Sequence, residues 1–291
     1  MGDLQYGTAS WSEESWEGVF YPKGTAPGDY LTYYASQFTT VEANVTYYRI
    51  PSREMVSGWD RKTPDGFALS AKFPRSIVHA GKGPRPDAGV LLKADKTGRD
   101  LEHFLDAMDL LGAKCGPLVL QFPYFNKQAF PSVDPFLARL DLFLAGLPDR
   151  FRYAVEIRNR NWLTPDLCEV LGRHCTALVL TDLSYMPHPA RVAEHLDVVT
   201  TDFVYGRLIG NRKAIDAVTT TFDKVVLDQT ARMKRWADLC RELLPRINTV
   251  YLYANNHYAG HAPDTIRALA AMIEESGAGE SSALPLPGDL L

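Results

Sequence analysis

Short apolar runs alternate with amphipathic, helix-like segments along the whole 291-residue chain. Such alternation is typical of βαβ units and predicts a parallel sheet covered by helices. The runs with the length and composition of strands cover residues 4–8, 39–44, 67–73, 118–122, 151–157, 177–182, 203–209 and 249–254. The chain therefore carries eight predicted strands, separated by segments with helical periodicity.

The segments between the strands contain helix start and stop signals. Thr164 followed by Pro165 is a cap with proline in the first turn, and Pro263 precedes another apolar stripe. Between residues 101 and 111, apolar side chains recur at i, i+3, i+4 and i+7, and the pattern stops at Gly112. Each of these segments can cover one side of a sheet.

Eight strand-and-helix repeats favour a closed (β/α)₈ barrel, the TIM-barrel fold, in a single α/β domain of residues 1–275. A doubly wound open sheet is the alternative, because one sequence does not state the order of its strands. Residues 276–291 have the composition of a flexible C-terminal tail, and we exclude them from the site.

Charge and composition narrow the class of protein. The formal net charge of −4 means that a nucleic acid would need a local basic patch. The chain shows no secretory pattern and no apolar run near the roughly 18 residues of a membrane span, so we expect a cytoplasmic protein without a membrane partner. Four scattered cysteines without zinc or disulfide spacing predict buried free thiols.

Catalytic groups in a parallel barrel lie where the strands end, on the inner face. Side chains alternate between the two faces of a strand, so the small residues Ala68 and Ser70 place Lys72 on the inner face of the third strand. The same alternation places Glu156 and Arg158 on the inner face of the fifth. A lysine, a carboxylate and a guanidinium are therefore predicted to converge at the mouth.

Most of the other strands also end in polar residues. These are Glu42 and Asn44 on the second, Gln121 on the fourth, Asp182 on the sixth, Tyr205 and Arg207 on the seventh, and Asn255 and Asn256 after the eighth. Any one of them could simply face water or form a structural ion pair. Together they are costly to bury in one funnel unless a network or a ligand compensates, so we predict a binding site there.

Several motifs resemble those of the DUF72, or YecE-like, family of uncharacterised proteins, from about residue 5 to about residue 272. The motifs are Gly7-Thr8-Ala9-Ser10-Trp11, Trp16, Phe20-Tyr21-Pro22, Val41-Glu42-Ala43-Asn44, Thr46-Tyr47-Tyr48-Arg49, Lys72-Phe73-Pro74-Arg75, His79, Gln121-Phe122-Pro123, Val155-Glu156-Ile157-Arg158, Trp162, Tyr205-Gly206-Arg207, Gly210, Tyr253-Ala254-Asn255-Asn256 and Gly260. Ala254 and Tyr47 depart from the phenylalanines usual in the family, which affects packing more than chemistry. The resemblance implies a barrel related in architecture to xylose-type sugar isomerases and to the endonuclease IV group, and it implies no established activity.

The residue types at the mouth favour an enzyme that acts on a small polyhydroxylated or phosphorylated, sugar-like ligand. Glu42 or Glu156 would act as acid or base, Lys72 as electrophile or proton carrier, and Arg158 completes the catalytic set. The predicted substrate-binding residues are Trp11, Asn44, Tyr47, His79, Gln121, Trp162, Asp182, Tyr205, Arg207, Asn255 and Asn256. The reaction stays open between isomerase, lyase and hydrolase chemistry.

The sequence names no cofactor. Glu42, Glu156 and Asp182 could share one Mg²⁺ or Mn²⁺ ion, but the histidines that related metal enzymes use are few, and we assign no metal ligand. A Schiff base at Lys72 is a second open route, and a salt bridge from Lys72 to Glu42 or Glu156 is its structural alternative.

A nucleic-acid-binding or nucleic-acid-processing protein is the alternative from a different class. The stretch from Lys72 to Lys96 includes Arg75, Lys82, Arg85 and Lys93 among glycines and prolines, and it could form a basic flap that grips phosphates. The same stretch could equally be a solvated loop.

Overall fold

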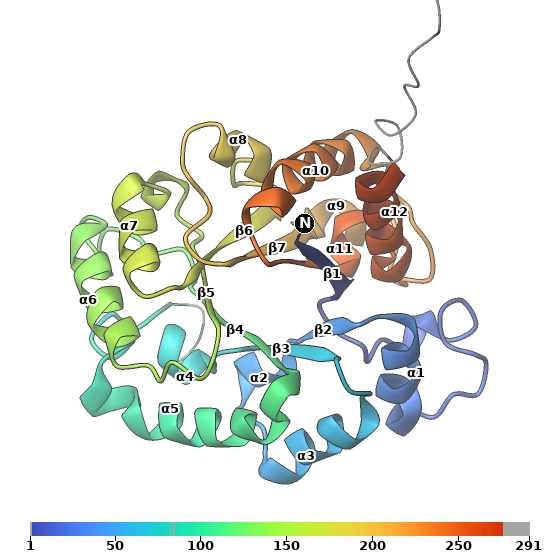
Figure 1. Ribbon diagram of the computed structural model, residues 1–291, viewed down its shortest axis with the longest axis horizontal. Coiled ribbons are helices and arrows are strands. Elements are labelled where there is room, and N and C mark those ends of the chain that lie inside the picture. The colour runs from blue at the N-terminus through green and yellow to red at the C-terminus, as the bar shows by residue number, and fades with distance from the viewer. Residues whose placement is uncertain (1, 82, 84, 276–291) are drawn as a thin grey trace, which may run out of the picture.

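Eight parallel strands form one ring in the computed structural model, which describes residues 2–81, 83 and 85–275 (Figure 1). The strands are β1 (Asp3–Thr8), β2 (Thr40–Ala43), β3 (Ala68–Lys72), β4 (Cys115–Gln121), β5 (Tyr153–Glu156), β6 (Ala177–Leu183), β7 (Phe203–Gly210) and β8 (Thr249–Ala254). Each strand from β2 to β8 pairs with its neighbour in sequence, and β8 also pairs with β1. The predicted (β/α)₈ barrel is confirmed, and the doubly wound alternative is wrong.

Helices surround this ring, as Figure 1 shows. The longer helices are α1 (Tyr30–Gln37), α3 (Arg53–Lys62), α5 (Ala94–Met108), α6 (Asp134–Ala145), α7 (Pro165–Arg173), α10 (Thr230–Leu243) and α12 (Ala262–Glu275). The short ones are α2 (Val45–Tyr48), α4 (Arg75–Val78), α8 (Pro189–Ala193), α9 (Arg212–Asp216) and α11 (Asn256–Ala259). Helices begin at Pro165 and at Ala262, as the signals at Thr164-Pro165 and Pro263 predict, and the Thr164 hydroxyl accepts a hydrogen bond from the Leu167 N–H at 3.4 Å.

Between β1 and β2, described strands that do not pair through their backbones, a side chain closes the barrel. The Tyr34 hydroxyl accepts a hydrogen bond from the Thr8 N–H at 2.7 Å and lies 3.2 Å from the Thr40 carbonyl oxygen, to which it can donate. A Cβ atom at Gly7 would lie 2.1 Å from that same carbonyl oxygen, closer than any real contact. Glycine at position 7 and tyrosine at position 34 therefore allow the first two strands to meet.

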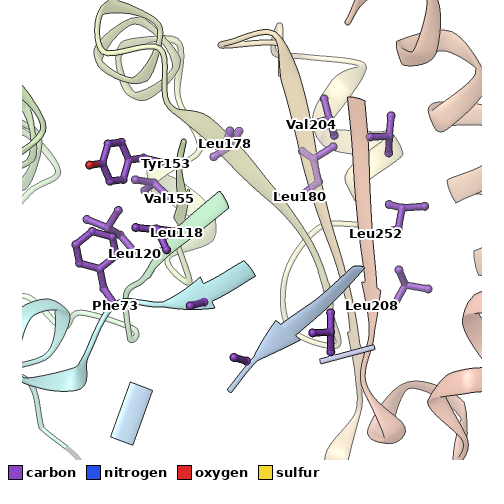
Figure 2. Close-up of a cluster of buried hydrophobic side chains, with 14 of the residues drawn as sticks. Phe73, Leu118, Leu120, Tyr153, Val155, Leu178, Leu180, Val204, Leu208 and Leu252 are labelled. Carbon is purple, nitrogen blue, oxygen red and sulfur yellow. The ribbon is translucent and has the colours of Figure 1, made fainter. Parts of the chain in front are cut away.

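Alternation along the strands separates two apolar layers. Phe73, Leu118, Leu120, Tyr153, Val155 and other outward side chains pack between the strands and the helices, away from the barrel interior (Figure 2). Inside the barrel, a smaller cluster that includes Val119, Ala154, Val179, Tyr205 and Tyr253 fills the space below the mouth. The predicted inner and outer faces of the third and fifth strands are confirmed.

Three further expectations concern the rest of the chain. The expectation that all four thiols are buried is wrong, because Cys175 is exposed between α7 and β6 and only Cys240 is fully buried. No helix in the described part of the chain is long and apolar enough to cross a bilayer. The predicted tail, residues 276–291, lies outside the described residues.

Candidate functional site

A ring of charged side chains fills the carboxyl end of the barrel. Glu42 comes from the end of β2, Lys72 from the end of β3, Glu156 from the end of β5 and Arg207 from β7. Both glutamates are fully buried, Arg207 is 1% exposed and Lys72 is 6% exposed. Such charges are stable in a barrel interior only when they neutralise one another, so their contacts decide what they can do.

Arg207 lies at the centre of this network. Its Nη2 donates to Glu42 Oε1 at 2.8 Å, and its Nη1 donates both to Glu156 Oε2 and, at 2.9 Å, to Gln121 Oε1. The Tyr205 hydroxyl donates to the other oxygen of Glu42 at 2.8 Å. The guanidinium thus joins β2, β4, β5 and β7, and its nearly complete burial makes it a group that positions the glutamates.

The two glutamates are held in the ionised form. Burial alone would raise the pKa of Glu156, but the charges of Arg207, Arg158 and Lys72 outweigh it and lower the pKa to about 2. The pKa of Glu42 is likewise lowered, because Arg207, Lys72 and the Tyr205 hydroxyl offset its burial. Near neutral pH both side chains are therefore carboxylates, without a proton to donate.

Unlike the two glutamates, Lys72 lies in surroundings that favour its uncharged form. Its Nζ lies 3.4 Å from Glu42 Oε1, and its backbone N–H donates to the Thr46 hydroxyl at 2.9 Å. Burial and the nearby Arg207 charge lower the pKa of Lys72 to about 8, although Glu42 and Glu156 counteract them. This amine can therefore gain or lose a proton close to neutral pH, which an exposed lysine cannot do.

Arg158 and Tyr47 lie at the more open side of the ring. The Arg158 side chain is 26% exposed, and its Nε donates to Glu156 Oε1 at 2.8 Å. Tyr47, on α2, is half-buried; burial raises its pKa, and the charges of Arg158 and Arg75 oppose that shift. The guanidinium of Arg158 is thus anchored on one carboxylate and still reaches solvent, as a contact for an anionic ligand requires.

Two buried polar atoms beside the ring have no hydrogen-bond partner in the part of the chain that the structure describes. They are Arg207 Nε and the Thr181 hydroxyl oxygen, and the two residues are register partners on the neighbouring strands β7 and β6. An unsatisfied buried polar atom costs roughly 1–3 kcal/mol, so such atoms usually contact a water or a ligand. Thr181 was not predicted as a polar group of the mouth, because it lies one residue before the end of an otherwise apolar run.

Asp182 does not join the ring, because it faces outward from β6. Its Oδ2 accepts hydrogen bonds from the Trp236 Nε1 at 3.1 Å and from the Tyr258 hydroxyl at 2.9 Å, and Arg232 pairs with the same carboxylate. His188 Nε2 lies 3.6 Å from Oδ2. The expectation that Asp182 shares the funnel is therefore wrong, since alternation places it against the helices.

The outward position of Asp182 excludes the metal site considered from the sequence, in which three carboxylates would bind one ion. Glu42 and Glu156 lie inside the barrel and Asp182 lies outside, so these three cannot share one ion. Among the described residues, no group of three or more His, Cys, Asp and Glu side chains converges as a metal site. Asp182 instead ties β6 to α10 and α11.

Three predicted substrate-binding residues lie elsewhere around the mouth. Trp162 is buried and stacks on Phe125 with ring centroids 5.6 Å apart. Trp11 packs edge to face on Trp59 at 5.6 Å. His79 is buried beyond α4, and its Nδ1 accepts a hydrogen bond from the Gly81 N–H at 3.2 Å. The stacking partners of Trp162 and Trp11 are therefore other aromatic side chains.

The predicted asparagines line a separate cavity of about 140 Å³ between the ends of β1 and β8. Its wall consists of Thr8, Ala9, Ser10, Glu13, Trp16, Asn44, Phe222, Ala254, Asn255, Asn256, His257 and Ala262. Asn44 follows Glu42 by two residues, so the cavity borders the ring. Glu13 was not predicted, because it lies on an irregular loop where no periodicity marks it.

The fold and the site define the class of protein: a (β/α)₈ barrel with a buried, interlocked charge ring at its carboxyl end. The chain belongs to the DUF72 family, described as "Protein of unknown function DUF72", whose family model matches residues 5–288. The resemblance noted in the sequence is confirmed.

Relatives and solved structures agree with this membership. The chain is 30% identical over 157 residues to the UPF0759 protein YecE of Escherichia coli (strain K12); the match covers 54% of this chain and 48% of YecE, about half its length. A DUF72 family crystal structure from Thermotoga maritima MSB8 is 26% identical, with a TM-score of 0.67 over 94% of this chain and 99% of that one. Another from Enterococcus faecalis V583, 19% identical, has a TM-score of 0.69 over 99% of both chains and supports the fold alone.

Proposed function

We propose that the protein is an enzyme that moves a proton on a small polyhydroxylated, anionic ligand at the barrel mouth. Lys72 carries the proton, and Arg158 contacts the anionic group. The observation that carries the proposal is the buried position of the Lys72 amine at the barrel mouth, 3.4 Å from Glu42 Oε1, and this burial also lowers its pKa to about 8. General acid–base catalysts work best when their pKa is close to the operating pH.

The roles of the two glutamates follow from their contacts. Both are ionised and bound by Arg207, so they set the position and the pKa of Lys72 instead of exchanging protons themselves. The hypothesis from the sequence had Glu42 or Glu156 as the acid or base. The proposal keeps only Lys72 as the group that exchanges a proton. At pH 7 about a tenth of a lysine with such a pKa is neutral and able to accept a proton.

A ligand screen followed by a proton-exchange assay tests this function. Purified protein is screened by thermal shift against sugar phosphates, sugar acids and neutral sugars, because any ligand of the native state raises its stability. Each ligand that binds is incubated in D₂O, and incorporation of deuterium is followed by NMR. We expect incorporation by the wild type and its loss, by at least about a hundredfold, in Lys72→Met.

Matched variants make the outcome specific. Lys127→Met and Arg160→Ala change exposed residues on the same face of the barrel and should leave exchange unchanged. Arg158→Ala should weaken the binding of anionic ligands and spare neutral ones. If Lys72→Met exchanges deuterium as fast as the wild type, Lys72 is not the proton carrier and the proposal fails.

Nucleic-acid binding is the second candidate, and one observation favours it. Tyr48, Tyr124 and Tyr185 are exposed and follow the carboxyl ends of β2, β4 and β6, where their rings could stack on unpaired bases. Of the predicted basic flap, Lys72 is instead buried in the ring, and Lys82 lies outside the described residues. This candidate predicts retention of a single-stranded oligonucleotide that weakens with salt and with Tyr124→Ala.

A further inference from the structure

The cavity between the ends of β1 and β8 is separate from the contacts of the charge ring and has its own polar character. It borders on three loops, those after β1, β7 and β8, and on Asn44 after β2. The volume of the cavity, about 140 Å³, is several times the roughly 10–15 Å³ that a cavity needs to hold one water. That space suits a small organic ligand better than a single ion.

The hydrogen-bonding groups of the wall are incompletely used. Trp16 is 1% exposed and lines the cavity, and its indole N–H finds no acceptor within the described ranges of the chain. Glu13 accepts a hydrogen bond from the Ser15 hydroxyl through one oxygen at 3.0 Å. Within the described residues, its other oxygen has only a long contact of 3.4 Å with Asn256 Nδ2. Among the described residues, the wall therefore includes a buried indole N–H without an acceptor and a carboxylate oxygen with one long contact.

The charge of the wall restricts the ligand further. Glu13 is its carboxylate, and the described residues that line the cavity include no lysine or arginine. A phosphate or carboxylate brings only acceptors and would meet the negative Glu13. An ammonium group brings only donors and would leave the Trp16 N–H unsatisfied. A hydroxyl group donates and accepts, so two neighbouring hydroxyls satisfy Glu13 and Trp16 together.

We infer that this cavity binds the uncharged, hydroxyl-bearing part of a monosaccharide or polyol. Glu13 accepts from one hydroxyl and Trp16 donates to another, while the ring of Phe222 covers an apolar face of the ligand. The inference rests on the proposed function only where it identifies this ligand as part of the substrate. A neutral sugar can bind in the cavity whether or not the charge ring catalyses a reaction.

Titration calorimetry with D-glucose, D-xylose, D-ribose and myo-inositol tests the inference on the full chain. We expect at least one of them to bind, and Glu13→Gln to weaken binding by about tenfold, because a charged acceptor is replaced by a neutral one. Glu14→Gln is the matched control: it removes the neighbouring, exposed carboxylate, which does not line the cavity, and should leave the affinity unchanged. Trp16→Phe, checked for an unchanged melting temperature, should also weaken binding.

The outcomes separate the cavity from the catalytic proposal. Sugar binding that is retained in Lys72→Met and lost in Glu13→Gln supports the inference that the cavity binds the sugar, whether or not the charge ring is catalytic. Binding that is lost in Lys72→Met and retained in Glu13→Gln places the sugar on the ring and overturns the inference. Absence of binding by all four neutral compounds overturns it as well and leaves the proton-exchange proposal to its own test.

Discussion

The ionisable side chains of the ring do not share one titration behaviour. Glu156 is surrounded by the charges of Arg207, Arg158 and Lys72, which outweigh the effect of burial and favour its charged form. Lys72 is surrounded by charges of both signs, so burial and Arg207 outweigh the two glutamates. One network therefore stabilises its carboxylates as anions and makes its amine easier to deprotonate.

The titration of Lys72 can be measured directly. We expect its ¹³Cε resonance, in protein labelled at lysine, to shift with a midpoint near pH 8. The ordinary pKa of lysine is 10.5, and burial together with Arg207 accounts for the difference. Lys72→Met assigns the signal by removing it. A midpoint above about 10 would show that the amine is not desolvated as the structure implies.

Replacing Glu156 by glutamine should destabilise the protein strongly. The substitution leaves Arg207 and Arg158 without their shared carboxylate, and breaking a buried ion pair costs about 3–5 kcal/mol. Urea unfolding near pH 7 measures the loss, and Glu169→Gln, on the outer helix α7, is the control. A loss under about 1 kcal/mol would mean that the ring relaxes around the change.

The same carboxylate predicts how stability depends on pH. Because the folded pKa of about 2 lies below the ordinary glutamate pKa of 4.5, Glu156 contributes stability above pH 4.5 and loses it as the pH falls toward 2. Unfolding free energies of the wild type should therefore fall across this range more steeply than those of Glu156→Gln. Equal slopes would show that Glu156 is not the group responsible.

At the scale of elements, the barrel depends on contacts that fix where strands meet and where they attach to helices. Asp182 holds β6 against α10 and α11 through Trp236 and Tyr258. Tyr34, on α1, holds β1 beside β2. Each of these links is a single polar side chain in an apolar layer, so its loss leaves buried groups without partners.

Tyr34→Phe should open the seam between β1 and β2. It removes the hydroxyl from the buried Thr8 N–H and Thr40 carbonyl, at a cost of roughly 1–3 kcal/mol. Chemical denaturation measures this cost, and hydrogen exchange at Thr8 should become faster. Tyr33→Phe, one residue earlier on the same helix and less buried, should change neither.

At the scale of the whole molecule, closure of the sheet makes the barrel one unit. Because β8 pairs with both β7 and β1, all eight strands belong to one continuous sheet, and Tyr34 links its two end strands, β1 and β2. The ring joins β2, β3, β5 and β7 across the mouth in addition. A substitution that destabilises one side of the barrel should therefore also destabilise the other side.

This closure predicts coincident unfolding transitions. The five tryptophans lie after β1, on α3, after β5 and on α10, so their fluorescence reports on several sides of the barrel. We expect the fluorescence and far-ultraviolet circular dichroism curves in urea to superimpose. Separate midpoints would show that parts of the barrel unfold independently.

The linear pattern of the chain determined the alternation of strands and helices and the inner face of the strands, whereas the strand order came from the tertiary structure. Eight apolar runs with helices between them are a local signal, and alternation along Ala68, Ser70 and Lys72, or along Ala154 and Glu156, states which side chains share a face. Alternation and strand ends alone were therefore enough to predict that several side chains converge, and these do lie together: Glu42, Lys72, Gln121, Glu156, Arg158, Tyr205 and Arg207.

Only the tertiary structure decided which partners these groups have. Nothing local to Asp182 indicates that α10 brings Trp236 to it. Nothing local to Glu13 or Trp16 indicates that both line a pocket with Asn256 at the ends of β1 and β8. The low pKa of Glu156 and the shifted pKa of Lys72 likewise arise from burial and from Arg207, which lies on a distant strand. Periodicity acts through neighbours in the chain, whereas burial and ion pairing act through neighbours in space.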